Sequence, residues 1–474
     1  MTRASAQIQV GSRRSPSMTG RSLRSSQTLP RRAYPATSEQ KKLSLFAAVF
    51  LVCVFIPWLW KIGSLVLSPY RLVLLVGFLH CMFLWCSGKA GRIRTPDIMI
   101  VSYCLWCALS LSVVHGVPTG VQSGGVIILE SAGAYFFGRC FIRGPEQFYA
   151  MTRLFLIIIA VMFPFALLET LSNTNVILYL FSKVFSVPPE SFKEARWGLR
   201  RVQGVFEHPI LFGVCCGAML SLVHMVYGSA QSTAKRWFAT TLVLTTAFLS
   251  LSSGPITALI AQISLIAWNW LFAKDARRWR YLWIVSLLMY ALMSLVSNQS
   301  VFELLLTHFS FEPASAYYRV LIWRFGSGSA LNHPLFGVGF GRWDRPAWMP
   351  PSIDMFWLYQ AVIFGLPAAA FMMGGFITMF ISIAFHKERN EQRLRYRTAY
   401  LIMMTGYFLV GWTVHFWDAT YVLFLFLLGS GGWLLDDVED QPPSRRRIVE
   451  RSFRARNSMN AARPPFKERL YLAP

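Results

Sequence analysis

Acidic side chains are scarce in this sequence. Asp and Glu together number 22 among 474 residues, against 46 Lys and Arg, and charged residues of all types make up only 14% of the chain. A soluble globular domain carries about 25% charged residues. The deficit, together with a hydrophobic fraction of 54%, argues against an ordinary soluble enzyme and indicates a protein that lies mostly in lipid.

The sequence also lacks the short motifs that bind nucleotides and catalytic metals. It has no Walker phosphate loop and no zinc-binding His-Glu-x-x-His pair, and its carboxylates do not cluster as a divalent cation would require. Gly337-x-Gly339-x-Gly341 has part of the spacing of a dinucleotide fingerprint but no preceding strand or following helix. We interpret it as a loop turn whose glycines permit tight backbone paths. No cofactor and no metal are predicted.

Cysteine is absent from the predicted outer loops. All 8 cysteines lie within apolar runs, so no structural disulfide is predicted outside the membrane. Cys104-x-x-Cys107 has the spacing of a redox or metal pair, but it falls in the middle of one predicted span. We interpret both residues as small apolar packing residues.

Membrane-length apolar segments are abundant. A hydrocarbon core about 30 Å thick requires about 20 helical residues, and about twelve continuous runs approach this length. We therefore predict an all-α polytopic membrane protein, since lipid requires every backbone polar group to be satisfied within the segment. The predicted spans are Leu43–Trp60, Arg71–Leu84, Ile98–Val114, Gly125–Phe141, Leu154–Leu171, Pro209–Tyr227, Trp237–Leu251, Ile256–Phe272, Tyr281–Ser297, Leu366–Phe385, Thr398–Phe416 and Ala419–Leu435.

Basic residues fall mainly on one side of the predicted membrane. With the N-terminus in the cytoplasm, about 35 of the 46 Lys and Arg lie in cytoplasmic tails and short loops, as the positive-inside bias requires. We predict disordered basic tails over residues 1–42 and 437–474 and one membrane domain over residues 43–436. An organelle transit peptide is the alternative for the first tail. Membrane topology accounts for the positive charge, so we predict contacts with anionic lipids and no nucleic-acid partner.

One predicted water-facing segment is far longer than a connection requires. Residues 298–356 separate the ninth and tenth spans and carry basic residues on the side that the positive-inside bias disfavours. Guanidinium groups match phosphate oxygens with two parallel N–H bonds, which predicts binding of a lipid diphosphate; contact with lipid headgroups is the alternative. Two groups of outer basic residues stand out: Lys193, Arg196, Arg200 and Arg201 before the sixth span, and Arg319, Arg324, Arg342 and Arg345 in this segment.

Other polar or aromatic side chains are candidates for substrate binding. Glu130 lies within a span, where an ionisable group usually faces the protein interior; we predict an arginine partner from a loop, with Arg201 as the candidate. His208 and His333 each precede a proline and are predicted either to meet a sugar or a proton or to hold their loops. Trp323 is predicted to stack on a sugar, with the bilayer interface as the alternative.

A series of short motifs resembles the superfamily of O-antigen ligases and polysaccharide polymerases. Their order, spacing and membrane side agree with that superfamily over nearly the whole predicted membrane domain. The motifs are Arg201-x-x-Gly204-x-Phe206-x-His208-Pro209-x-x-Phe212-Gly213, Leu249-Ser250-Leu251-Ser252-Ser253-Gly254, Arg319-x-x-x-Trp323, Pro334-Leu335-Phe336-Gly337-Val338-Gly339, and Asp354-x-x-x-Leu358 before Gly365.

This resemblance implies a metal-independent glycosyltransferase that faces the periplasm. Such proteins transfer a glycan from undecaprenyl pyrophosphate onto a sugar hydroxyl, so the expected partners are an undecaprenyl-pyrophosphate-linked oligosaccharide donor, a glycan acceptor and membrane lipids. Exopolysaccharide assembly proteins are a further partner class that the resemblance allows. It also implies a bacterial inner-membrane location with both termini in the cytoplasm. The anion-binding arginines of the superfamily correspond to Arg201 and Arg319, and then to Arg200 and Arg324.

Asp354 departs from the ligase pattern. Ligases often carry His-Asn-x-x-Leu where this sequence has Asp354-Met355-Phe356-Trp357-Leu358. The carboxylate in place of histidine favours an exopolysaccharide polymerase over an O-antigen ligase that uses lipid A core. We predict Asp354, Arg201 and Arg319 as catalytic, with Asp354 either accepting the hydroxyl proton or capping the next helix. A polytopic transporter or lipid flippase is the alternative from another class, for which inverted repeats are expected.

Overall fold

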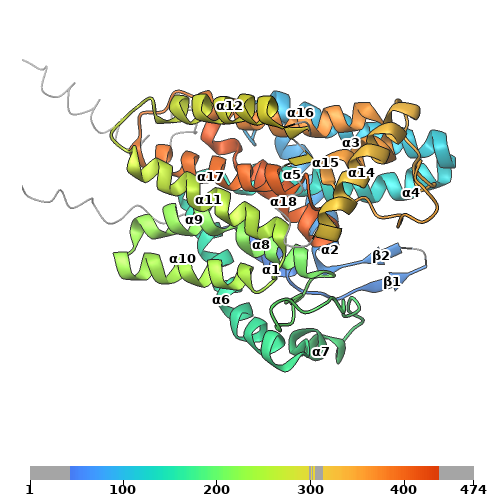
Figure 1. Ribbon diagram of the computed structural model, residues 1–474, viewed down its shortest axis with the longest axis horizontal. Coiled ribbons are helices and arrows are strands. Elements are labelled where there is room, and N and C mark those ends of the chain that lie inside the picture. Colours follow the sequence, from blue (N-terminus) through green and yellow to red (C-terminus); the bar gives the residue numbers. More distant parts are fainter. Residues whose placement is uncertain (1–42, 64, 298–299, 302, 305–312, 437–474) are drawn as a thin grey trace, which may run out of the picture. The chain divides into compact units, whose positions relative to one another are not determined.

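The computed structural model describes residues 43–63, 65–297, 300–301, 303–304 and 313–436. Both predicted tails and part of the predicted large loop lie outside these residues. Within them helices predominate, joined by several long loops (Figure 1). The α-helices are α1 (Leu45–Val54), α2 (Pro69–Cys86), α3 (Thr95–His115), α4 (Val117–Ile128), α5 (Ala134–Phe141), α6 (Pro145–Ser172), α7 (Val176–Ser182), α8 (Pro209–Ala218), α9 (Leu220–Met225), α10 (Thr233–Phe248), α11 (Ser253–Leu271), α12 (Arg278–Val296), α14 (Pro313–Asn332), α15 (Phe356–Phe364), α16 (Leu366–Phe385), α17 (Glu391–Val410) and α18 (Asp418–Ser430). A π-helical turn, η1 (Leu129–Gly133), joins α4 to α5, and the 3₁₀ turns η2 (Tyr227–Ala230) and η3 (Gly432–Leu435) follow α9 and α18.

The long helices run back and forth between two ends of the bundle (Figure 1). At one end β1 (Trp60–Ile62) pairs antiparallel with β2 (Leu65–Leu67). Just before this hairpin, the N–H of Leu59 donates to the carbonyl of Ser186 at 2.8 Å, which brings the long loop between α7 and α8 to the same end. We call this the site end. The opposite end carries the basic turns at residues 87–94, 272–277 and 386–390.

Eight helical segments of the described residues are long and apolar enough to cross a membrane. The remaining predicted spans correspond to helices that are short, broken or charged. α1 has only 10 residues, α4 and α5 are interrupted by the π-helical turn, α10 has 16 residues, and α17 begins with Glu391 and Arg393. The all-α polytopic class is therefore confirmed, while the number of crossings stays a prediction.

Two segments differ from the predicted elements. Only α1 lies within the predicted span Leu43–Trp60, because the chain leaves the helix before Pro57 and turns through Gly63, whose φ of 62° is left-handed. The predicted large loop contains α14, a helix of 20 residues that the sequence analysis does not assign. Its apolar residues are interrupted by Arg, Ser and Gly, so it forms no continuous apolar run.

Buried ion pairs close the bundle at the opposite end. The Arg139 side chain is 1% exposed; its Nη1 lies 3.4 Å from Asp436 Oδ2 and its Nε lies 3.9 Å from Asp97 Oδ1. Tyr135 donates to Asp97 Oδ1 at 2.6 Å, and Arg94 Nη2 lies 3.0 Å from Asp436 Oδ1. Separating these segments would leave buried charges without partners, which is strongly destabilising. The network therefore holds α3, α5 and the end of η3 together.

Glycines let α5 and α18 meet backbone to backbone. A Cβ atom at Gly429 would lie 1.9 Å from the carbonyl oxygen of Tyr135, and one at Gly138 would lie 2.1 Å from that of Phe426. Small residues permit the close helix approach on which packing in membranes depends. Gly125 of α4, in contrast, has nothing within 4 Å of such an atom.

We expect Gly429→Ala to destabilise the protein, because the added methyl group forces α5 and α18 apart. Overpacking of this kind costs about 1–3 kcal/mol. The measurement is the thermal unfolding midpoint of the purified protein in detergent, with Gly125→Ala as the matched control that adds the same methyl group where there is room. Equal midpoints for the two variants would contradict the close contact of α5 and α18.

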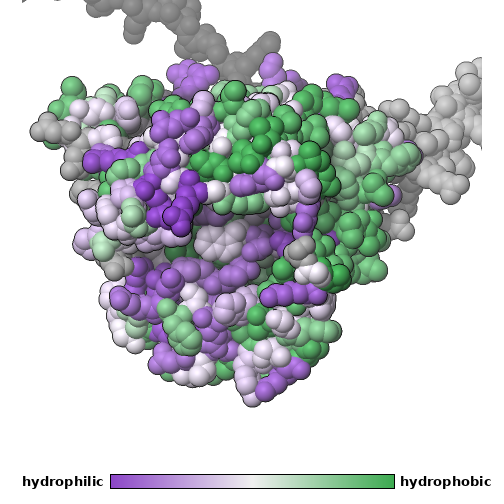
Figure 2. All heavy atoms as spheres, turned by 90° about the vertical axis from the view of Figure 1, so that its right-hand side faces the viewer, coloured by the Kyte–Doolittle hydropathy of each residue, from purple (hydrophilic) through white to green (hydrophobic). Residues whose placement is uncertain are grey.

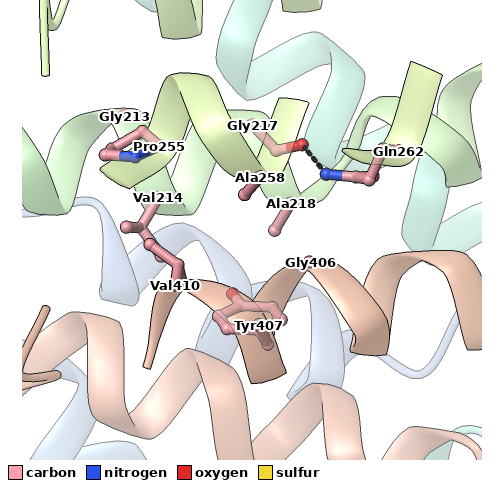
Figure 3. Close-up of a pocket in the computed structure, with 10 residues that line it drawn as sticks. All are labelled: Gly213, Val214, Gly217, Ala218, Pro255, Ala258, Gln262, Gly406, Tyr407 and Val410. Atoms are coloured by element: carbon pink, nitrogen blue, oxygen red, sulfur yellow. Dashed lines mark hydrogen bonds between the residues drawn. The ribbon is translucent and has the colours of Figure 1, made fainter. Parts of the chain in front are cut away.

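A small crevice lies between α8, α11 and α17 (Figure 3). Its cavity volume is only about 10 Å³, about the room that one water molecule needs. The Gln262 side chain donates to the carbonyl of Gly217 at 3.0 Å across one wall. Apart from Gln262 and Tyr407 the lining is apolar, so no charged group lines this crevice.

Candidate functional site

The site end is hollowed at its centre (Figure 2). Hydrophilic residues surround the hollow, whereas hydrophobic residues cover much of the flank beside it. The charged side chains described below come from loops, from helix termini, from α14 and from η1. A polar depression at the end of an apolar bundle can hold a charged group while the apolar part of the same molecule stays in lipid.

Arg201 lies on a loop that is bonded to the turn between α10 and α11. The N–H of Val202 donates to the carbonyl of Leu249 at 3.0 Å, and Arg201 Nη2 donates to the Ser252 hydroxyl at 2.9 Å. Arg196 on the same loop donates through Nη1 to the carbonyl of Leu251 at 2.7 Å. Arg196 and Arg201, two of the predicted outer basic residues, are thus both bonded to the turn that the Leu249–Gly254 motif forms.

Arg319 projects from α14 and is 7% exposed. Its Nε donates to the carbonyl of Thr413, in the turn between α17 and α18, at 3.3 Å. Burial lowers the pKa of Arg319, the nearby Arg196 charge acts in the same direction, and the Asp354 carboxylate opposes both. A guanidinium remains charged under these conditions. Arg196 and Asp354 therefore both lie within electrostatic reach of Arg319.

Asp354 lies two residues before α15 and does not cap it. The cap residue is Met355, and no side chain caps the helix. The first amides of α15 are bonded to the α17–α18 turn instead: Phe356 N–H donates to the carbonyl of Val414 at 3.1 Å and Trp357 N–H to that of Gly411 at 3.4 Å. The capping alternative is therefore wrong.

The Asp354 carboxyl is partly buried among basic groups. Burial raises its pKa above the ordinary value, although Arg319, the Ser352 hydroxyl and Lys193 act in the opposite direction. An ionised carboxylate in such a place is a stronger base than an exposed one. The structure therefore brings together Asp354 and Arg319, two of the predicted catalytic residues, and places Lys193 near them.

The Pro334–Gly339 motif holds the far end of α15. Val338 N–H donates to the carbonyl of Val362 and Gly339 N–H to that of Ile363, each at 2.9 Å. Gly337 and Gly339 have φ values of 63° and 56°, in the left-handed region that glycine adopts readily. The turn interpretation of these glycines is confirmed, and the motif fixes α15 in place rather than binding a nucleotide.

Glu130 is bound by an arginine, but not by the predicted one. Its Oε1 lies 2.7 Å from Nε of Arg71 at the start of α2 and accepts a bond from Tyr70 at 3.2 Å. Arg71 Nη2 also lies 3.0 Å from Asp418 Oδ1 at the start of α18. The proposed Arg201 partner is wrong because the π-helical turn directs Glu130 toward α2, which sequence spacing could not reveal.

Arg200 and Arg324 do not join Arg201 and Arg319. Arg200 Nη2 lies 2.7 Å from Glu190 Oε2, and its Nε lies 3.8 Å from Glu169 Oε1. The Arg324 side chain is 62% exposed and pairs with Glu303 at 2.8 Å. Both guanidinium groups are thus paired with carboxylates, and their substrate-binding roles stay predictions.

The remaining predicted residues lie in different surroundings. His208 caps α8 through Nδ1, which accepts the Ile210 N–H at 3.1 Å; burial, with the charges of Lys193 and Arg201, lowers its pKa to about 3. His208 is therefore neutral at physiological pH and holds its loop. His333 is half exposed beside Asp344, 3.8 Å away. Trp323 of α14 packs edge-on against Trp412, with ring centroids 6.1 Å apart.

Sequence reasoning does not single out Arg71, Glu207 or Asp418 as site residues. Arg71 stands at the outer end of a predicted span, where the positive-inside bias disfavours a basic residue. That departure is the sequence signal by which Arg71 could have been recognised as a site residue. Glu207 lies inside a recognised motif, but the electrostatic effect of Asp418, more than two hundred residues later in the chain, on its pKa arises from tertiary structure alone.

Comparison with known proteins identifies the domain. Residues 238–365 match the family profile described as O-antigen ligase. The chain carries an O-antigen ligase domain. The match begins in α10 and ends at Gly365 after α15, so it includes Arg319 and Asp354, whereas Arg201 and His208 precede it. A search of curated proteins gives no match.

The predicted superfamily is therefore confirmed. Members of the O-antigen ligase family are glycosyltransferase-like ligases and polymerases, and this chain is a multi-pass membrane protein of that broad type. Among the residues that the structure describes, no three His, Cys, Asp or Glu side chains gather as a metal site would require. Metal independence stays a prediction.

Proposed function

We propose that the protein is an exopolysaccharide polymerase. It transfers a glycan from undecaprenyl pyrophosphate to an acceptor sugar hydroxyl at the periplasmic face of the bacterial inner membrane. The observation that carries the proposal is the presence of Arg201, Arg319 and Asp354 at one polar end of the O-antigen ligase bundle. Cationic groups suit the diphosphate of the donor, and the carboxylate suits the hydroxyl of the acceptor.

The arginines supply the electrostatic part of the mechanism. Negative charge grows on the bridging phosphate oxygen as the bond between the sugar and the diphosphate breaks. The Ser252 hydroxyl orients Arg201, and the Thr413 carbonyl orients Arg319. Side chains whose orientation is fixed by folding stabilise developing charge better than water, which must reorganise. Arg196 and Lys193 add to the positive potential of the same region.

Asp354 supplies the base. The acceptor hydroxyl attacks the anomeric carbon of the donor, and its proton passes to the Asp354 carboxylate when the two oxygens lie within about 3 Å. Burial, which raises the pKa of Asp354, makes the ionised group a better acceptor of that proton. Arg319, within electrostatic reach of Asp354, favours the ionised form of that carboxyl.

The distribution of charge supports the membrane orientation. The opposite end carries the short basic turns, as a cytoplasmic face does, whereas the basic residues of the candidate site occur in the long segments between α7 and α8 and between α12 and α15. A lipid-linked donor would place its polyprenyl chain beside the hydrophobic flank and its diphosphate at the hollow of the site end (Figure 2). Both termini then lie in the cytoplasm.

O-antigen ligation onto lipid A core is the second candidate, since the matched family profile carries that description. Asp354 in the place of the ligase histidine favours the polymerase.

A synthetic undecaprenyl pyrophosphate oligosaccharide, supplied to proteoliposomes that contain the purified protein, distinguishes the candidates. Chain elongation to a glycan ladder is the expected result. Transfer only onto added lipid A core would indicate a ligase, and translocation without any new glycosidic bond would indicate a transporter.

A further inference from the structure

A charged cavity opens at the opposite end of the bundle, where the chain passes from α16 to α17. Its volume is about 570 Å³, within the range of sites that hold small ligands. The side chains that line it are His386, Lys387, Glu388, Arg389 and Arg397. The lining contains no residue of the candidate site, so this cavity takes a ligand of its own.

The carboxylate of the lining is already engaged within its own loop. Glu388 accepts the N–H groups of Arg389 and Asn390 at 2.8 and 2.9 Å. It also forms an ion pair with the buried Arg393, which is not part of the lining. Because Arg393 neutralises Glu388, the lysine and the two arginines of the lining leave the cavity with net positive charge.

One of those arginines is held in place in the wall of the cavity. The Nη1 of Arg397 donates to the carbonyl of His386 at 2.6 Å, which ties α17 to the end of α16. A guanidinium carries five N–H groups, and its planar fork matches phosphate oxygens. Lys387 and Arg389 are exposed on either side of Glu388. The cavity thus combines one oriented guanidinium with two mobile cations, a set that suits a phosphate group.

An apolar row on α16 leads to the cavity. Ile377, Ile381 and Phe385 are 41%, 50% and 81% exposed, and their spacing of four residues places them on one face of the helix. The row spans about 12 Å along the helix axis and ends one residue before His386. Because α16 is long and apolar enough to cross a membrane, this exposed face lies against acyl chains in a bilayer. A phosphate in the cavity would have hydrocarbon directly beside it.

We propose that the cavity binds the phosphate of an anionic phospholipid, whose acyl chain follows the α16 row. Basic pockets at the ends of membrane helices hold such headgroups, because the cations lie at the depth where the lipid presents its phosphate. A soluble phosphate would meet the same cations but would gain nothing from the row. The inference concerns a site apart from the polymerase reaction and does not depend on it.

Lys387→Gln combined with Arg389→Gln tests the proposal in the full-length protein in detergent. Both side chains are exposed, so the two amides remove charge without disturbing the bundle. Native mass spectrometry counts the bound lipids as phosphatidylglycerol or phosphatidylcholine is titrated. We expect the unmodified protein to prefer phosphatidylglycerol. The double variant should bind that lipid about 25-fold more weakly, because each Lys or Arg beside an anionic lipid contributes about fivefold.

Two further double variants separate the cavity from positive charge in general. Lys274→Gln with Arg280→Gln removes an exposed lysine and an exposed arginine from the same end, outside the cavity, and should keep the preference for phosphatidylglycerol. Lys387→Arg with Arg389→Lys exchanges the two residues of the cavity without changing its charge, and it should keep the preference as well.

The α16 row has a test of its own. Phe385→Ala removes a ring that the acyl chain would contact, so it should lower the affinity for phosphatidylglycerol. Phe238→Ala is the matched control, since it removes the same ring from α10 at a position that is 74% exposed, and it should leave that affinity unchanged.

Inorganic phosphate distinguishes a lipid headgroup from a soluble anion. Compared with chloride at equal ionic strength, which screens exposed charges equally, phosphate at millimolar concentration should leave the bound phosphatidylglycerol in place. Displacement by phosphate would indicate a soluble-anion site and overturn the lipid assignment. Equal affinities for the two lipids in the unmodified protein would also overturn the proposal, as would binding of phosphatidylglycerol to the Lys387→Gln, Arg389→Gln variant at the level of its control.

Discussion

Arg319→Ala and Arg201→Ala should each reduce glycan transfer by about 10²- to 10³-fold, the usual effect of removing one fixed donor to a developing oxyanion. In the double variant we expect no detectable polymer. Arg319 is the more sensitive position because it is 7% exposed and lies within electrostatic reach of Asp354. In the proposed mechanism, its loss removes a diphosphate contact and also the charge that favours the ionised form of Asp354. The measurement is the initial rate of chain elongation in proteoliposomes.

Lysine substitutions separate charge from geometry at the same positions. A lysine keeps the positive charge but lacks the planar fork that binds two phosphate oxygens at once, so Arg319→Lys should recover only part of the lost rate. Arg280→Ala, an exposed residue at the opposite end, is the matched control. Polymer output that survives the double substitution at Arg201 and Arg319 would contradict the anion-binding role of both residues.

Asp354→Asn should retain donor binding and lower kcat by about 10²- to 10⁴-fold, the range for loss of a general base. Because burial raises the pKa of Asp354, the carboxyl is protonated and inactive up to a higher pH than an ordinary Asp. The acid limb of the kcat profile in the unmodified protein should therefore lie above the usual Asp range, with activity increasing as pH rises through it. The variant should show no such limb.

A neighbouring substitution in the same loop gives the control for Asp354. Asp344→Asn makes the same chemical change at a side chain that is 45% exposed, and it should leave the rate and its pH dependence unaltered. Donor binding is followed separately with a fluorescent lipid diphosphate. Turnover in Asp354→Asn at the level of Asp344→Asn would end the base assignment.

Local sequence patterns were sufficient for the class of fold and for part of the site. Continuous apolar runs predicted most of the long helices, and the positive-inside bias pointed to Arg201 and Arg319, whose roles stay predictions. The glycines of the Pro334–Gly339 motif predicted a turn correctly, because left-handed φ angles are a local property of the chain.

The same local patterns could not predict contacts between segments that are distant in the sequence. Glu130 was expected to meet an arginine, but its spacing in the sequence could not reveal that a π-helical turn directs it to Arg71. Asp354 precedes α15 as a capping residue would, but the first amides of α15 donate instead to the carbonyls of Val414 and Gly411. In each case the deciding partner belongs to another helix and has no signature near the residue itself.

The short helix α15 has a consequence for biogenesis. Its amino end is closed by carbonyls of the turn after α17, and its carboxyl end is closed by amides of the Pro334–Gly339 turn. Nine residues are too few to form a stable helix alone, so α15 is completed only after α17 has been synthesised and inserted. Nascent chains that stop earlier cannot hold Asp354 in place, and they would remain inert toward lipid-linked sugars during translation.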